Sequence, residues 1–297
     1  MGRQAPELVA APALRPVLTL TQEELLVLTH GDLGVVPPRI PLPADPDQRD
    51  LALAVATRSL MARGLVTPEP AEAKPGPAGA AVTQPEGAAP RAAGPPDAAT
   101  WAATEPLGLT LCLRALAPCV LALQRVLGPH PGGAPDPSVA TRYLHLHSGI
   151  AVLEDVTDHG MHSLLAIERE HWERAVAEFI VPPDAEPGAG PVRVLGAGEG
   201  AAGDLLADLG HPTVLVEAGA LLPDGVESLM VALGPGGTFL SQDSQRYHPT
   251  TPGQAVTELL RQTEATLLSE DAVSEGAMSE DTASEDTVSE ESATMGE

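Results

Sequence analysis

The most regular pattern of apolar and polar positions in the chain lies between Thr141 and Val181. From residue 142 to 147 the two kinds alternate with period two, as in a strand with two different faces. Leu144 and Leu146 would lie on one face, and the other would carry Tyr143, His145 and His147. Two further apolar runs follow after glycine-containing turns. The sequence therefore predicts three antiparallel strands.

A helix is expected to follow these strands and to end at Val181, before two prolines. Apolar side chains recur there at i, i+3, i+4 and i+7, which makes one stripe of an amphipathic helix. The stripe consists of Trp172, Ala175, Val176 and Phe179. We expect it to lie on the strands.

The N-terminal part of the chain, residues 17–66, predicts a short strand and two helices. A strand at 17–20 leads into Thr21-Gln-Glu-Glu24, the form of a capping box at a helix start. A second helix is expected from about Gln48 to Arg63. Its most regular line contains Leu51, Val55, Arg58 and Ala62.

Pro118 divides the next apolar stretch into a helix and a strand. A proline inside one long helix would cost about 3 kcal/mol. The helix from Leu107 therefore has to stop at Ala117, and 119–126 is expected to be a strand. The apolar face of the helix would consist of Leu109, Leu113 and Leu116.

The order of elements occurs twice along the chain. Residues 113–124 are matched by 206–217, with two leucines three apart, a proline and then an apolar strand. Residues 228–262 have the same succession of strands, turns and helix as 142–180, and Thr251 and Gln254 form a second capping box. The prediction is two diverged copies of a helix-strand-hairpin-helix unit, which form a pseudo-symmetric pair and share one sheet. The two copies would occupy 106–183 and 191–268.

Three segments are expected to be disordered. Residues 1–16 are rich in proline and alanine, and residues 67–105 contain 13 Ala, 8 Pro and 4 Gly, too little apolar mass to offset the entropy of ordering. The C-terminal residues 269–297 hold five pentads of the SEDAV type, with 7 Glu, 3 Asp and no basic residue. Self-repulsion predicts an acidic disordered tail.

Charge and cysteine content limit the partners. A formal charge of -25 argues against a nucleic-acid backbone or an anionic membrane as the main partner, because both demand clustered cations.

Two cysteines are too few for a disulfide framework, and no signal peptide or apolar run of about 18 residues is visible. A cytoplasmic protein is expected, as a monomer or a homodimer.

A glycine-rich turn at 196–203 resembles a dinucleotide-binding fingerprint. Gly198, Gly200 and Gly203 follow an apolar strand, and Glu217 ends a second strand about 20 residues later. A nucleotide-binding enzyme is therefore the alternative function. Against it, the segment is rich in Gly and Ala, part of it belongs to the repeat, and too little chain remains for further parallel strands.

Histidines form the only other cluster of chemically active residue types. His145 and His147 share a strand face, and a hairpin could bring His162 nearby, so a metal site is a candidate. The competing interpretation is a solvent-facing strand. The carboxylates in EDVTD, residues 154–158, are interpreted as charges that protect a hairpin edge. No set of residues makes an active site, so we expect no catalytic residue and no cofactor.

The ordered part of the chain resembles the EspG family of type VII secretion chaperones of actinobacteria. The similar segments are LTLTQEELLVL with the following PPRIPLP, the helix end SLMARGLV, LRALAPCVLAL, RYLHLHSGIAVLED and VALGPGGTFL. The resemblance implies an α+β fold with a pseudo-twofold repeat, a central mostly antiparallel sheet and flanking helices. It also implies a cytosolic non-enzyme that binds an apolar helical segment of PE/PPE-type export substrates. The segment 67–105 and the acidic tail depart from the family pattern, and no family binding residue can be placed on this sequence.

Overall fold

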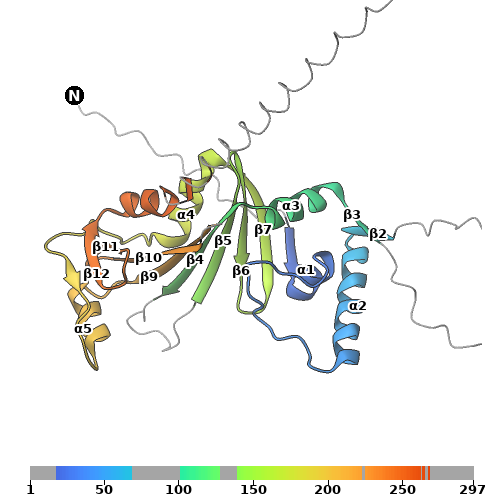
Figure 1. Ribbon diagram of the computed structural model, residues 1–297, viewed down its shortest axis with the longest axis horizontal. Coiled ribbons are helices and arrows are strands. Elements are labelled where there is room, and N and C mark those ends of the chain that lie inside the picture. Colours follow the sequence, from blue (N-terminus) through green and yellow to red (C-terminus); the bar gives the residue numbers. More distant parts are fainter. Residues whose placement is uncertain are drawn as a thin grey trace, which may run out of the picture. The chain divides into compact units, whose positions relative to one another are not determined.

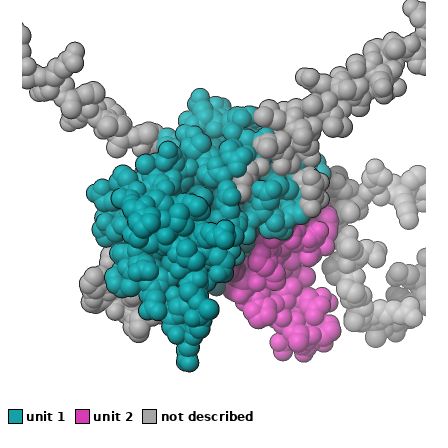
Figure 2. Space-filling model, turned by 60° about the vertical axis from the view of Figure 1, so that its left-hand side comes forward, with its two compact units in different colours: residues 1–20, 113–297 teal, residues 21–112 magenta. Residues whose placement is uncertain are grey.

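The computed structural model describes residues 18–68, 101–127, 139–222, 225–261, 263–264 and 267. The chain divides into two compact units (Figure 2). One comprises Thr21–Cys112, and the other comprises Met1–Leu20 together with Leu113–Glu297. The expected disordered segments 1–16 and 269–297, and residues 69–100 of the expected insertion, lie outside the described residues.

The larger unit is built on a sheet that contains ten strands among the described residues, in the order β1-β7-β6-β5-β4-β9-β10-β11-β12-β8 (Figure 1). The strands are β1 (Leu18–Thr21), β4 (Cys119–Leu127), β5 (Val139–Leu146), β6 (Ile150–Val156), β7 (Met161–Glu168), β8 (Arg193–Val194), β9 (Val214–Leu222), β10 (Gly225–Gly234), β11 (Gly237–Ser241) and β12 (Arg246–Thr250). Every pairing from β7 across to β8 is antiparallel. The prediction of an α+β fold with a large antiparallel sheet is confirmed.

Helices pack on both faces of this sheet (Figure 1). On one face, α4 (Trp172–Ile180) follows the short 3-10 turn η1 (Arg169–His171) and shares a core with the helical residues 252–261. The predicted stripe of α4 is buried there: Trp172, Ala175, Val176 and Phe179. On the other face, α5 (Ala201–Asp208) packs Leu205 near Phe239.

The helix α3 (Glu105–Ala115) ends before Pro118, as the sequence predicts, but its buried face was predicted wrongly. Leu109 and Leu116 are exposed, whereas Leu107 and Arg114 are buried. Leu107 and Arg114 are seven residues apart, two turns along one side of the helix. A hydrophobicity count could not select this side, because it carries a charge.

The smaller unit contains α1 (Gln22–Leu28), α2 (Pro46–Ala62) and a two-stranded sheet of β2 (Val66–Pro68) and β3 (Trp101–Ala103). The capping box is confirmed: Glu24 N–H donates to Thr21 Oγ1 at 3.1 Å, and Thr21 N–H donates to Glu24 Oε2 at 3.0 Å. The two ends of the expected insertion at 67–105 are ordered, contrary to the prediction. Trp101 supplies the reason, since its ring stacks on His30 with 5.8 Å between the ring centroids.

Within the described parts of the chain, no helix combines the length and the apolar character that crossing a bilayer requires.

Candidate functional site

The structure gives the glycine-rich turn a local backbone role. Gly198 and Gly200 have φ angles of 108° and 93°, in the left-handed region that favours glycine, and Gly200 caps α5. An added Cβ at Gly203 would meet no atom within 4 Å, so this glycine does not serve close packing of helix on strand. Each of the first two glycines thus has a conformational explanation that needs no nucleotide.

The strands around this turn also differ from a dinucleotide-binding unit. The preceding strand, β8, has two residues, lies at the end of the sheet order and pairs antiparallel with β12. Three strands separate β8 from β9, which carries Glu217. In a nucleotide-binding βαβ unit the two strands would belong to a parallel sheet with the site at their carboxyl ends. The geometry does not favour the enzyme alternative.

Of the candidate metal ligands, two histidines converge on one carboxylate. His145 Nε2 lies 2.8 Å from Glu154 Oε2, and His162 Nδ1 lies 2.6 Å from Glu154 Oε1. His147 lies elsewhere, with Nε2 2.8 Å from the Leu113 carbonyl oxygen. Within the residues described here, no three His, Cys, Asp or Glu side chains form a group that could hold a metal ion. Both histidines on Glu154 act as hydrogen-bonding groups in the interior.

Arg114 completes this Glu154 cluster, which we define as Glu154, His145, His162 and Arg114. Arg114 Nε donates to Glu154 Oε2 at 2.8 Å, and its Nη2 donates to Oε1 at 3.3 Å. All four side chains are buried, and the Glu154 carboxylate is 0% exposed. The carboxylate is held by donors from α3, β5 and β7 together.

The electrostatics of the Glu154 cluster favour a charged carboxylate and a neutral His145. Burial by itself would raise the pKa of the Glu154 carboxyl, but hydrogen bonds from His145 and His162 and the charge of Arg114 hold that pKa well below its usual range. Burial lowers the pKa of His145, and its contact with Glu154 only partly opposes this effect. Glu154 can therefore act as a buried anion beside a buried cation.

The interpretation of EDVTD as an edge-protecting charge group is wrong for Glu154. β6 lies inside the sheet, between β5 and β7, and Glu154 is opposite Tyr143 and Leu164. The solvent-facing interpretation of His145 and His162 is wrong, because both side chains are buried. One signal in the sequence could have indicated burial: Glu154 shares its period-two strand face with the apolar residues Val152 and Val156. No pattern in the sequence around Glu154 indicated that Arg114, 40 residues away, would be its partner.

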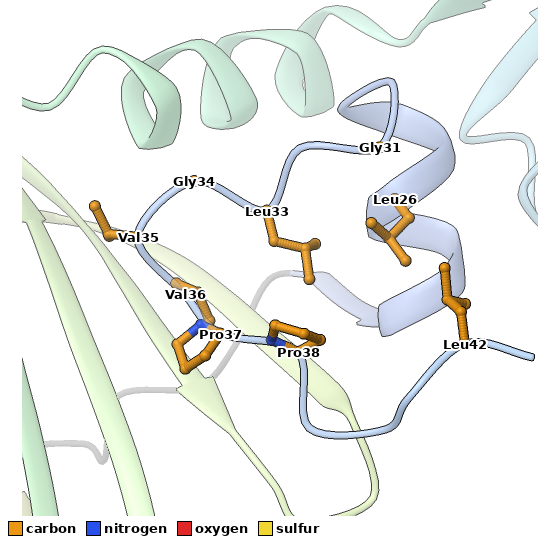
Figure 3. A pocket seen from close by; sticks show the side chains of 9 residues that line it. All are labelled: Leu26, Gly31, Leu33, Gly34, Val35, Val36, Pro37, Pro38 and Leu42. Carbon is orange, nitrogen blue, oxygen red and sulfur yellow. The ribbon is translucent and has the colours of Figure 1, made fainter. Parts of the chain in front are cut away.

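A separate feature of the smaller unit is an open apolar pocket of about 510 Å³ (Figure 3). Leu26 of α1 and Leu33 and Leu42 of the following loop point toward it, and Pro37 and Pro38 form part of its wall. Leu26 and Leu33 are buried. Val35 also lines the pocket and is 43% exposed. The lining is thus aliphatic at the points where a ligand would make contact.

The loop that forms this pocket is held in place by Gln22. The side chain of Gln22 is fully buried, and its Oε1 accepts from Arg39 N–H at 2.7 Å and from Ile40 N–H at 3.1 Å. Its Nε2 donates to the Ile40 carbonyl oxygen at 2.5 Å. The amide of one side chain at the start of α1 therefore holds Arg39 and Ile40, the last two residues of the PPRI segment. The pocket is preformed, which lowers the entropy cost of binding.

The helix α2 also leaves apolar side chains uncovered. Leu51 and Val55, one turn apart, are 64% and 55% exposed, while Ala56 and Leu60 supply the buried face. The predicted line of Leu51, Val55, Arg58 and Ala62 is thus the exposed side of the helix. Singly exposed apolar residues are common, but two on one helical turn make a small apolar stripe.

The chain was compared with protein-family models and with curated protein sequences, and none of them matches.

Proposed function

We propose that the protein is a non-enzymatic adaptor that holds an apolar helical segment of a protein partner. The resemblance to the EspG family suggests the class of partner, PE/PPE-type export substrates of type VII secretion, and a place of action in the cytoplasm. The observation that carries the proposal is the preformed aliphatic pocket beside α1.

The physical support comes from what the pocket offers a ligand. Its contact surface is aliphatic, and Gln22 holds the wall in place before any ligand arrives. A Leu, Val or Ile side chain of a partner gains about 1.5–3 kcal/mol on full burial. A helix presents such side chains at i, i+3 and i+4, so it can place one in the pocket and others beside it. The exposed stripe of α2 offers further apolar area within the same unit.

The test is co-purification of the tagged full-length chain from its native host, with identification of the bound proteins by mass spectrometry. We expect short helical export substrates. Val35→Glu should weaken their binding at least about tenfold, or 1.4 kcal/mol, because it places a charge in the aliphatic wall. Val35 is already partly exposed, so this variant should remain folded.

Val226→Glu is the matched control, since Val226 is 69% exposed and belongs to the larger unit. It should bind the partner as the unmodified chain does. The adaptor proposal fails if the protein is recovered alone at native abundance, or if Val35→Glu binds as well as the control. It also fails if NAD, FAD, ATP or S-adenosylmethionine raises the melting temperature, since a saturated specific site adds about 2.7 kcal/mol at 100 times its dissociation constant.

We also propose that the larger unit arose by duplication, with a pseudo-twofold axis between β4 and β9. The support is the succession of elements: from this antiparallel pair, the chain adds β5, β6 and β7 on one side and β10, β11 and β12 on the other. A helix follows the last strand of each series. Sequence profiles built separately from residues 113–180 and 206–261 of diverged relatives should match each other. Profiles that match no better than shuffled sequences would contradict a duplication.

A further inference from the structure

We infer that the Glu154 cluster is an acid-sensitive lock, in which a proton taken up by His145 loosens the packing between the last turn of α3 and strands β5 to β7. The lock lies in the larger unit and does not depend on the proposed adaptor function.

The hydrogen bonds of His145 show which protonation state of its ring fits the interior. His145 gives its Nε2 hydrogen to Glu154 Oε2, so in the neutral ring Nδ1 carries the lone pair. Nδ1 of His145 is buried and, within the described residues, has no hydrogen-bond partner. A second proton would create a buried N–H donor without an acceptor. Such a group costs its full desolvation penalty.

The charges of the cluster balance only while its imidazoles are neutral. Glu154 supplies one negative charge, and Arg114, which is 5% exposed, supplies one positive charge. A proton on His145 leaves a net positive charge in the interior, directly beside the Arg114 guanidinium. Arg114 therefore opposes the protonation of His145 while it satisfies Glu154.

The groups around His145 include other titratable side chains. Those facing it or close to it are Glu154 on β6, Arg114 on α3, His162 on β7, and Tyr143 and His147 on its own strand segment. Glu154 favours the charged imidazole, whereas Arg114 and His147 oppose it. Burial adds to the opposition and is the largest effect, so the pKa of His145 lies below its ordinary value of 6.5.

The direction of the pH effect follows from that lowered pKa. Below pH 6.5 the unfolded chain takes up a proton at this position more readily than the native state does. The stability that His145 contributes is present above this pH and falls as the pH decreases toward the native pKa, by at most a factor of about ten in the unfolding constant per pH unit. Glu154 adds a similar loss only below its ordinary pKa of 4.5. Between pH 6.5 and 5.5, the loss of stability due to His145 can therefore be measured without a contribution from Glu154.

The experiment measures urea unfolding of the full chain at pH 7.5, 6.5 and 5.5, for the unmodified protein and for His145→Gln. The glutamine amide can donate to Glu154 from about the position of Nε2, but it does not titrate. We expect the unfolding constant of the unmodified chain to rise more between pH 6.5 and 5.5 than that of His145→Gln, by up to about fivefold, because half of the unfolded chains already carry this proton at pH 6.5. All other histidines are common to both proteins and cancel.

His171→Gln is the control, because the side chain of His171 is 39% exposed. Its pH dependence should equal that of the unmodified protein. The lock is refuted if His145→Gln also keeps the unmodified dependence. If that variant does not fold, NMR titration of the His145 ring in the unmodified protein provides the test. A titration midpoint below pH 6.5 supports the lock, and a midpoint at or above pH 6.5 refutes it.

Discussion

Glu154→Gln should destabilise the larger unit by about 3–5 kcal/mol, the range for breaking a buried ion pair by removing one partner. The substitution removes the negative charge that balances Arg114 at the end of α3, while Arg114 remains buried. It also weakens the acceptors of His145 and His162. Urea unfolding at pH 7.5, followed by circular dichroism, measures the loss.

Asp155→Asn provides the comparison on the adjacent residue of β6. Asp155 pairs with Arg142 at 2.6 Å, but its side chain is 38% exposed, so solvent screens this pair. We expect a loss of at most about 1 kcal/mol. Arg114→Met combined with Glu154→Gln should recover part of the larger loss, because no uncompensated buried charge remains. Equal losses for Glu154→Gln and Asp155→Asn would show that burial does not set the energy of the Glu154 cluster.

Trp172→Ala should cost about 3–5 kcal/mol, the range for truncating a buried aromatic side chain. Trp172 is 1% exposed and begins α4, where it joins the core shared with strands of the sheet and the helical residues 252–261. Its removal leaves a cavity in this core and removes the ring from under the Arg169 guanidinium. With an m-value of about 2 kcal/mol per molar urea, the midpoint should fall by about 2 M.

Trp101→Ala is the matched control, since Trp172 and Trp101 are the only two tryptophans of the chain. Trp101 belongs to the smaller unit, is partly exposed and stacks on His30. Its truncation should cost about 1 kcal/mol, the scale of one aromatic pair. A midpoint shift as large as that of Trp172→Ala would contradict the expectation that the burial of the Trp172 ring sets the size of the loss.

Local patterns predicted the elements whose structure depends on neighbours in the sequence. The capping box of Thr21 and Glu24 is such a case, because its two hydrogen bonds join residues three apart. The stop at Pro118 is another, since it follows from the missing N–H of proline. The buried stripe of α4 needed only the helical period. The observed ends of α2 and α3 differ from the predicted ends by up to about two residues, which is common for helix ends.

Partners far apart in the sequence were not predictable in this way. The period-two pattern placed His145 on the face opposite Leu144, but it could not reveal whether solvent or protein covers that face. The ordered ends of the segment 67–105 depend on the pairing of β2 with β3 and on the stacking of Trp101 with His30. The average composition of residues 67–105 does not reveal that the few residues at its two ends form these contacts.

The sequence by itself therefore determined the α+β class, the strands and helices of the larger unit and the position of its apolar core, because apolar period and capping act over a few residues. Only the tertiary structure decided that Glu154 is an interior anion, that His145 and His162 donate to it and that Arg114 balances its charge. The physical reason is that burial and charge balance depend on side chains 8 to 40 residues apart in the sequence, which meet only once the sheet and α3 are assembled.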